Sequence, residues 1–301
     1  MTYDLVIIGG GIAGISAAIY AKRSNLNVLL IEKGAIGGLL NNIDKIKNYP
    51  GFTEISGPDL AQKLLEQLQD LDLEIKFEEV VNIVLEDNLK KVETKSNEYL
   101  AKSVLIATGR IPKKIGLNNE ENLYGRGLST CALCDANFFK GKDVAVVGGG
   151  NSALQEALYL ANIVNKVYLI HRRDKFRADE KLVNEIEEKD NIEIVYNSNV
   201  TNINTEAEIV TSVTLDSGKN INVSGVFVYI GFVPGVSFIE ELGITNEKGY
   251  IITNGYGETN IQGVYAAGDI IEKQIYQLVT AASEGAIAAI NINSYCKKTM
   301  K

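Results

Sequence analysis

Residues 2–23 read TYDLVIIGGGIAGISAAIYAKR and give the strongest indication of the fold class. An uncharged apolar run leads into a cluster of glycines, after which small and apolar residues recur at helical spacing. A continuous apolar run is typical of a strand that is buried on both faces of a parallel sheet. The stretch therefore predicts a buried strand, a tight glycine loop and a helix, in that order.

The glycine loop has the spacing G-x-G-x-x-G at Gly9, Gly11 and Gly14. A side chain in this loop would keep a pyrophosphate away from the backbone amides and from the helix N-terminus. Glu32 ends the next apolar segment, 18 residues past Gly14, where a carboxylate can accept hydrogen bonds from a ribose. The combination predicts a dinucleotide site, and the alternative is a tight turn that binds no ligand.

The same order of strand, glycine loop, helix and strand returns at 142–173, KDVAVVGGGNSALQEALYLANIVNKVYLIHRR. Gly148, Gly150 and Ala153 occupy the three loop positions. A chain of 301 residues is long enough for two domains of roughly 100 to 200 residues each. The repeat predicts an α/β protein with two Rossmann-like, three-layer dinucleotide-binding domains.

The residue in register with Glu32 is His171, and Arg172, Arg173 and Arg177 follow it. A carboxylate at this position would repel a phosphate on the ribose, whereas guanidinium groups bind a phosphate through charge-assisted hydrogen bonds. The second loop therefore predicts NADPH rather than NADH, with His171 lining the adenosine end. The alternative is a solvated basic turn.

Charge and cysteine content restrict the partners and the compartment. The chain has 38 acidic and 30 basic residues, and a net charge of −8 argues against nucleic acid as the main partner. Three cysteines cannot form the disulfide framework of a secreted protein, so we expect a cytoplasmic protein. Residues 5–21 are uncharged, but three glycines interrupt them, and we expect no membrane span.

A resemblance to a known family rests on several further segments. They are KNYPGF at 47–52, ATG at 107–109, GRG at 125–127, CALCD at 131–135, HRRDKFR at 171–177 and TNIQGVYAAGD at 259–269. With the two glycine loops, these segments make the chain similar to the low-molecular-weight bacterial thioredoxin reductases, which are class II pyridine nucleotide-disulfide oxidoreductases. The resemblance extends over essentially the full length.

The resemblance implies a discontinuous FAD domain, residues 1–113 and 234–301, into which an NADPH domain, residues 114–233, is inserted. It implies FAD contacts from Gly9, Gly11, Ile12, Ala13, Gly14, Glu32, Lys33, Gly38, Leu39, Asn48, Thr108, Gly109, Gly268, Asp269, Tyr276, Gln277 and Leu278. It implies NADPH contacts from Gly148, Gly150, Asn151, Ser152, Ala153, His171, Arg172, Arg173 and Arg177. Family members usually have Gln, Arg and Gly where this chain has Leu39, Tyr276 and Ala136, so we expect FAD to bind but its reduction rate or electron donor to differ.

Two of the three cysteines, Cys131 and Cys134, lie close together in STCALCDANFF, residues 129–139. A structural zinc site needs about four ligands, and the chain offers only Cys296 and His171 besides this pair, so we expect no metal. A structural bridge across so short a loop would constrain the unfolded chain little and is disfavoured in the cytosol. A redox couple remains, in which one thiol attacks a disulfide and the other resolves the mixed disulfide.

The resemblance also divides the roles within this motif. Cys134 would face the flavin, Cys131 would attack the disulfide of a thioredoxin, and Asp135 would act as general acid and base. For Asp135 the alternative is an ordinary turn residue. Because the cysteine pair and the NADPH loop lie in the same inserted domain, the family rotates that domain to bring each to the flavin in turn.

The expected activity is NADPH-dependent reduction of thioredoxin, with electrons passing from NADPH to FAD, to the cysteine pair and to thioredoxin. The partner would dock near Arg126, Phe138 and Phe139, whose alternatives are a surface charge and core aromatics. The resemblance also implies a homodimer. Other possibilities are a related flavin-dependent oxidoreductase with ferredoxin as donor, or with oxygen or a thioredoxin-like protein as acceptor, and a non-enzymatic redox sensor.

Overall fold

The computed structural model describes residues 2–86, 88–235 and 237–299, and it divides into two compact units. The first unit consists of Met1–Ile111 and Pro234–Lys301, and the inserted unit consists of Pro112–Val233. The sequence places the domain boundaries at 113/114 and 233/234, and the two units meet at 111/112 and 233/234. Two short strands, β7 (Arg110–Pro112) and β16 (Phe232–Pro234), pair where the chain passes from one unit to the other.

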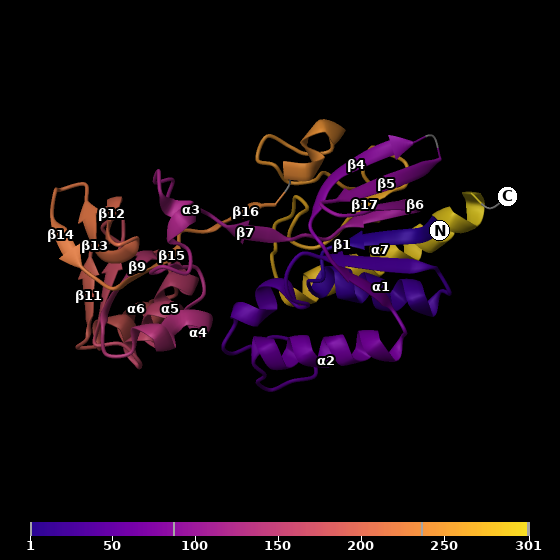
Figure 1. Cartoon of the computed structure of the whole chain (residues 1–301). Helices are drawn as coiled ribbons and strands as arrows, with labels where there is room; N and C mark the ends of the chain where they lie inside the picture. The colour runs from indigo at the N-terminus through magenta and orange to yellow at the C-terminus, as the bar shows by residue number, and fades with distance from the viewer. Residues whose placement is uncertain (1, 87, 236, 300–301) are drawn as a thin grey trace. The chain divides into compact units, whose positions relative to one another are not determined.

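One sheet organises the first unit, in the order β3-β2-β1-β6-β5-β4, with β17 also paired to β6 (Figure 1). Its strands are β1 (Thr2–Ile8), β2 (Val28–Glu32), β3 (Glu74–Phe77), β4 (Val80–Glu86), β5 (Leu89–Thr94), β6 (Glu98–Ile106) and β17 (Val264–Ala266). The pairs β1–β2, β2–β3, β1–β6 and β6–β17 are parallel, and β4–β5 and β5–β6 are antiparallel.

Both faces of this sheet are covered, which explains why β1 is apolar without interruption from Leu5 to Ile8. Leu5 and Ile7 face a core formed with the helices α1 (Ile12–Arg23), α2 (Gly57–Asp70) and α7 (Leu278–Thr299). Val6 and Ile8 face a second core on the opposite side, which includes residues of β5 and of the short helix η3 (Ser237–Leu242). The helices α1 and α7 lie side by side (Figure 1).

The inserted unit repeats this design with a parallel sheet in the order β11-β10-β9-β15-β8. Its strands are β8 (Leu128–Ser129), β9 (Asp143–Gly148), β10 (Lys166–Ile170), β11 (Ile192–Val195) and β15 (Gly225–Tyr229). The helices are α3 (Glu120–Leu123), α4 (Ala132–Asp135), η2 (Ala136–Phe139), α5 (Asn151–Ala161) and α6 (Glu180–Glu187). An antiparallel sheet of β12 (Val200–Glu206), β13 (Ile209–Leu215) and β14 (Asn220–Asn222) shares a core with β9 and β15.

In the main sheet of each unit, the strand that leads into a glycine loop lies where the strand order reverses. The strand β1 lies between β2 and β6, and β9 lies between β10 and β15. In open α/β sheets, ligands bind at such a switch point, beyond the carboxyl ends of the strands. The predicted α/β fold with two such units is confirmed, and each unit presents one glycine loop at its switch point.

Candidate active site

The first glycine loop joins β1 to α1 beside the end of β6. Gly9 has a φ angle of +106°, and a Cβ atom at this position would lie 2.5 Å from the carbonyl oxygen of Ala107. A Cβ atom on Gly14 would overlap the carbonyl oxygen of Gly9. Both positions therefore require glycine, the first because of its backbone angle and both because the chain packs so closely.

Gly11 differs from its neighbours because a Cβ atom there would meet no other atom within 4 Å. Gly11 is the N-cap of α1, it offers no side-chain cap, and no acidic residue occupies the first helical turn. The free amides and the positive end of the helix dipole are therefore not compensated by the protein. This geometry fits the pyrophosphate of a dinucleotide.

Glu32 ends β2 and is held against this loop. Its Oε2 accepts a hydrogen bond of 2.6 Å from the Gly10 amide, and its Oε1 accepts one of 2.7 Å from the Gly34 amide. A carboxylate offers about four acceptor sites, so two of them remain for the hydroxyl groups of a ribose. The Glu32 side chain thus fixes the loop, and it keeps acceptor sites for the ribose that the sequence predicts here.

Two of the expected FAD contacts lie in the short helix η1 (Gly38–Asn42). The preceding residue, Gly37, forms a β-bridge with Gly11, and this bridge brings Gly38 next to the first loop. Leu39 is half-buried. Leu39, for which the resemblance implies a Gln, follows Gly38 directly and offers no polar group.

The other expected FAD contacts also belong to the first unit. Gly268 lies against α1, since a Cβ atom on it would be 2.8 Å from the Cβ atom of Ala13. Asn48 donates a hydrogen bond of 3.0 Å to Gln277, although the two are distant in sequence. Others are Ile12 in the first turn of α1, Lys33 directly after β2, Thr108 and Gly109 two and three residues after β6, Tyr276 two residues before α7, and Leu278 at the start of α7.

Arg110 is a residue that the sequence did not single out, yet it lies among these contacts. Its Nη2 is 3.0 Å from Oδ2 of Asp269, and its guanidinium carbon is 4.1 Å from the centre of the Tyr276 ring. Lys273 forms ion pairs with Asp269 at 3.2 Å and with Glu284 at 2.8 Å. Two cations thus lie beside Asp269: Lys273 is four residues along the chain, whereas Arg110 comes from a distant segment that no spacing relates to Asp269.

The second loop is open at the corresponding position. Gly150 is the N-cap of α5, a Cβ atom on it would meet nothing within 4 Å, and the first turn contains no acid. Asn151 donates a hydrogen bond of 2.9 Å to the Asp179 carboxylate and accepts one of 2.8 Å from the Asp179 amide. Ser152 is exposed, and Ala153 is fully buried against the sheet. This end of α5 also fits a phosphate group.

His171 is buried against the second loop, and a Cβ atom on Gly149 would overlap its ring. Its Nε2 lies 3.0 Å from the Lys175 carbonyl oxygen. Burial, and to a smaller extent the charges of Arg173 and Arg172, lowers the pKa of His171. The imidazole is therefore neutral at neutral pH, and it shapes the site without adding charge.

Arg172, Arg173 and Arg177 are exposed around this loop. Among the residues that the structure describes, none of these three side chains forms an ion pair with a carboxylate. The backbone amide of Arg177 donates a hydrogen bond of 2.8 Å to the Gly149 carbonyl, which fixes the basic turn to the loop. Three guanidinium groups are therefore available to an anion beside the second nucleotide loop.

The cysteine pair forms a disulfide, with the Cα atoms of Cys131 and Cys134 5.3 Å apart. Cys131 is only 9% exposed, whereas Cys134 is exposed. The Cys134 amide donates a hydrogen bond of 3.1 Å to Sγ of Cys131. These exposures are opposite to the roles that the resemblance implies, because an attacking sulfur must reach a partner's disulfide.

Three polar groups hold the turn that carries this disulfide. The hydroxyl of Ser129 donates a hydrogen bond of 2.6 Å to the Asp135 carboxylate and accepts one of 3.0 Å from the Cys131 amide. The hydroxyl of Tyr229 accepts a hydrogen bond of 2.8 Å from the Ala132 amide. Burial raises the pKa of Tyr229, so its hydroxyl stays protonated. Asp135 is therefore fixed beside the cysteine pair, and neither Ser129 nor Tyr229 was anticipated from the sequence.

The sequence profile of one protein family, described as pyridine nucleotide-disulphide oxidoreductase, matches residues 3–286. The chain belongs to this family. It is 42% identical to a thioredoxin reductase of Bacillus subtilis over 301 residues, which cover 98% of this chain and 95% of that protein. Membership implies the use of a flavin and a pyridine nucleotide.

Two solved structures also support the assignment of this chain to the family. A thioredoxin reductase of Lactococcus lactis is 38% identical, with a TM-score of 0.91, and the match covers 98% of this chain and 99% of that one. A thioredoxin reductase of T. acidophilum is 34% identical, with a TM-score of 0.88, and the match covers 100% and 99%. The predicted relationship to the bacterial thioredoxin reductases is confirmed.

A groove of 580 Å³ lies on the inserted unit of this oxidoreductase, close in sequence to the cysteine pair. It is lined by Gly125, Arg126, Gly127, Phe138, Phe139, Lys142, Ala207, Glu208, Ile209, Val210 and Ser224. Arg126 and Glu208 form an ion pair in its wall. Phe138 is 75% exposed, whereas Phe139 is buried and packs edge-on against Phe227. Of the two phenylalanines expected to meet a partner, only Phe138 is free to do so.

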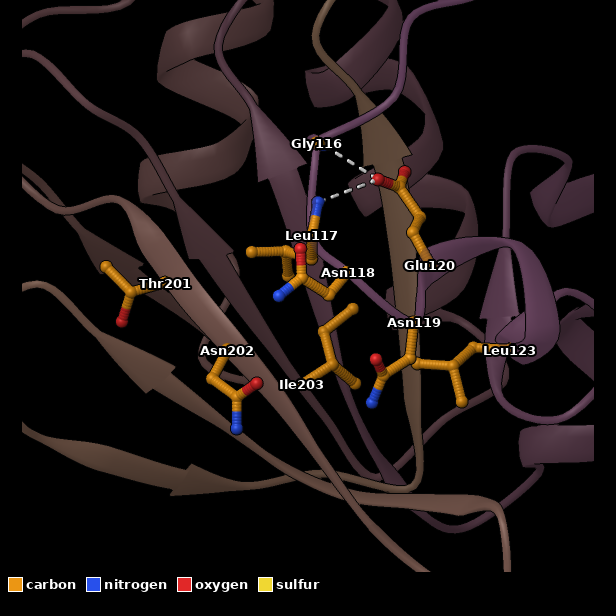
Figure 2. Close-up of a pocket in the computed structure, with 9 residues that line it drawn as sticks. All are labelled: Gly116, Leu117, Asn118, Asn119, Glu120, Leu123, Thr201, Asn202 and Ile203. Carbon is orange, nitrogen blue, oxygen red and sulfur yellow. Dashed lines mark hydrogen bonds between the residues drawn. The ribbon is translucent and has the colours of Figure 1, made fainter.

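A second cavity, of 240 Å³, lies elsewhere on the inserted unit, between the segment 116–123 and strand β12 (Figure 2). Glu120 turns its carboxylate toward the backbone and accepts hydrogen bonds from the amides of Ile115, Gly116 and Leu117 at 2.9, 2.7 and 3.4 Å. The Tyr124 hydroxyl donates a fourth hydrogen bond to this carboxylate, of 3.3 Å, so its acceptor sites are all used within the turn. Glu120 is therefore a structural residue that satisfies backbone donors.

Two further features are absent from the part of the chain that the structure describes. No helix within 2–86, 88–235 and 237–299 combines the length and the apolar character that a membrane crossing requires. The same described residues contain no group of three or more His, Cys, Asp and Glu side chains arranged to hold a metal ion.

Proposed function

We propose that the chain transfers electrons from NADPH through bound FAD to the Cys131–Cys134 disulfide, and from there to the disulfide of a thioredoxin. One observation carries this proposal: a disulfide with one exposed cysteine and an adjacent carboxylate lies in the same unit as an open nucleotide loop ringed by arginines. The thioredoxin reductases among the relatives support the choice of partner. The overall reaction converts NADPH, a proton and oxidised thioredoxin into NADP⁺ and reduced thioredoxin.

We assign FAD to the first unit. The open position at Gly11, the uncapped start of α1 and the two free acceptor sites of Glu32 fit its pyrophosphate and ribose. The packing of Gly268 against α1 and the hydrogen bond between Asn48 and Gln277 within the same unit also support this assignment. When bound there, FAD would supply an acceptor for the hydride of the nicotinamide and a two-electron donor to the disulfide.

We assign NADPH to the inserted unit. The amides at the start of α5 would bind the pyrophosphate, and Arg172, Arg173 and Arg177 would bind the 2′-phosphate. His171 is buried and neutral, so it would contact the adenosine without adding a charge to the site. The available guanidinium groups favour NADPH over NADH because NADH lacks the phosphate that they would bind.

The exposures within the disulfide lead us to assign the attack on thioredoxin to Cys134. Once reduced, an exposed Cys134 thiolate can approach the partner's disulfide, whereas Cys131 is buried. Cys131 then attacks the mixed disulfide at Cys134 and releases the partner's second sulfur. The hydrogen bond from the Cys134 amide would stabilise a thiolate at Cys131 during this step. Asp135 would take the proton of the attacking thiol and pass it to the departing sulfur.

We place the docking of thioredoxin at the groove that contains Phe138 and Arg126. Phe138 follows Cys134 in the same chain segment and exposes most of its ring, so it can enter an apolar contact close to the reacting sulfur. We further propose a cytoplasmic homodimer, which the family resemblance favours. Analytical ultracentrifugation of the FAD-loaded protein tests the oligomeric state.

An assay of the purified protein tests the function directly. The assay contains NADPH, oxidised thioredoxin and an aromatic disulfide that reports free thiols. We expect thiol release only when both this protein and thioredoxin are present. Without thioredoxin, the rate should fall to a small fraction of the full rate. An equal rate without thioredoxin would show that a small disulfide, rather than a protein, is the acceptor.

Replacing Arg172 and Arg173 with Ala should raise the KM for NADPH by at least about tenfold. Each charged hydrogen bond that is lost costs about 1.5–3 kcal/mol, and about 1.4 kcal/mol corresponds to a tenfold change. The KM for NADH should change little, because NADH has no 2′-phosphate. Steady-state kinetics with both nucleotides provide the measurement.

The matched control replaces Lys181 and Lys189, which are exposed cations of the same unit outside the second loop. We expect this variant to keep the KM for NADPH. An equal rise in KM for NADPH and NADH in the arginine variant would refute the phosphate assignment.

A further inference from the structure

Ser129 occupies a fixed position at the edge of the cysteine turn. It ends strand β8, where it is paired with Phe227 of strand β15, and it is only 4% exposed. Its hydroxyl accepts a hydrogen bond of 3.0 Å from the Cys131 amide. The same hydroxyl lies 2.6 Å from Oδ2 of Asp135. One buried side chain therefore connects the backbone of a reactive cysteine to the neighbouring carboxylate.

The geometry determines where the single hydroxyl proton of Ser129 points. The Asp135 oxygen is 2.6 Å away and the Cys131 carbonyl oxygen is 3.3 Å away, so the proton lies toward the carboxylate. A distance of 2.6 Å is typical of a hydrogen bond from a hydroxyl to an ionised carboxylate, which is stronger than a neutral one. Because the hydroxyl also accepts from the Cys131 amide, the two hydrogen bonds polarise each other.

We propose that Ser129 is a positioning residue that holds the Asp135 carboxyl group in register with the cysteine pair during the exchange of disulfides. This inference rests on the proposed function. The Asp135 carboxylate takes the proton of the Cys134 thiol, the Cys134 thiolate attacks one sulfur of the thioredoxin disulfide, that bond breaks, and the departing sulfur takes the proton back from Asp135. Cys131 gives its proton to Asp135 in the same way and attacks Cys134, the mixed disulfide breaks, and the second thioredoxin sulfur leaves with that proton as a thiol. Two electrons and two protons thus pass to thioredoxin, and the Cys131–Cys134 disulfide is restored.

A carboxylate without this hydrogen bond can rotate away from the departing sulfur. General acid catalysis by a positioned group contributes about 10²- to 10⁴-fold to a rate. Loss of positioning, with the carboxyl group still present, should remove part of that factor. We therefore expect Ser129→Ala to lower kcat for thioredoxin by about 10- to 100-fold while the KM for thioredoxin stays within about twofold. Reduction of the flavin by NADPH precedes every thiol step and should keep its rate.

Three variants of the FAD-loaded protein complete the test. Ser129→Thr retains the hydroxyl and should restore most of the kcat. Ser103→Ala removes another fully buried hydroxyl, which donates to the Asp4 carbonyl oxygen in the first unit, and should leave kcat unchanged. In the Asp135→Asn background, Ser129→Ala should cause no further loss, because a residue that acts only through Asp135 has nothing left to position.

The outcomes separate this inference from the proposed function. Unchanged kcat in Ser129→Ala, or a full additional loss in the Asp135→Asn background, would overturn the positioning role while thioredoxin reduction by the unaltered protein stands. Slower flavin reduction by NADPH in Ser129→Ala and Ser129→Thr alike would also overturn it, since it would indicate a general structural role. No thioredoxin reduction by the unaltered protein would overturn the proposed function and the inference with it.

Discussion

Replacing Cys131 with Ser should yield a protein that forms a stable covalent adduct with thioredoxin through Cys134. The exposed Cys134 thiol would still attack, but no second thiol would remain to resolve the mixed disulfide. Catalytic reduction of thioredoxin should fall by several orders of magnitude, because the complete exchange needs both sulfurs. Mass spectrometry of the adduct, after digestion, identifies the cysteine that is attached to the partner.

Two further variants control this experiment. Cys134→Ser removes the exposed sulfur and should give no adduct under the same conditions, although it should be equally inactive. Cys296→Ser replaces the remaining cysteine, which is fully buried, and should keep full activity. An adduct on Cys131 in Cys134→Ser, with none in Cys131→Ser, would reverse the two roles and restore the assignment that the resemblance implies. Undiminished turnover in either variant would refute the dithiol mechanism.

Gly11→Asp is expected to produce a folded protein that has lost FAD. Gly11 has φ −75° and ψ −179°, a Cβ atom there meets nothing within 4 Å, and aspartate is a favoured N-cap, so folding should not suffer. The new carboxylate would lie where the pyrophosphate binds and would repel it. We expect the affinity for FAD to fall at least about 100-fold, which corresponds to about 2.7 kcal/mol. Circular dichroism reports the fold, and the absorbance of bound flavin reports the loss.

Gly150→Asp is the matched variant in the inserted unit. Gly150 is likewise an N-cap with open space around it. This variant should remain yellow, because the first loop is intact, but NADPH should no longer reduce its flavin at ordinary concentrations. Retention of FAD by Gly11→Asp, or loss of FAD in Gly150→Asp, would show that the two nucleotides are assigned to the wrong loops.

The parts of the site that follow one another in the chain could be predicted from the sequence. A loop that needs glycine at Gly9 and Gly14 has few structural solutions, since backbone atoms fill the space that side chains would take. The correspondence between Glu32 and His171 could be predicted because both loops lie in the same kind of strand-helix-strand unit, with the two residues at the same distance from their loops. Local geometry of this kind leaves a readable spacing.

The contacts between distant segments could not be predicted, because packing alone brings them together. Tyr229 reaches the Ala132 amide from another strand, and Arg110 reaches Asp269 from a position far away in the sequence. No periodicity marks either contact. The exposure of Cys134 and the burial of Cys131 likewise depend on how a short turn packs on the sheet, and two cysteines at this spacing look equivalent in the sequence.

An anaerobic titration of the FAD-loaded protein tests whether electrons pass from NADPH through the flavin to thioredoxin. NADPH is added while the flavin absorbance is followed, and oxidised thioredoxin is then added to the reduced protein. We expect NADPH to bleach the flavin band, and thioredoxin to restore it with the appearance of one reduced thioredoxin per NADPH consumed. A flavin that NADPH does not bleach but reduced ferredoxin does, or a bleached flavin that oxygen reoxidises and thioredoxin does not, would contradict the account.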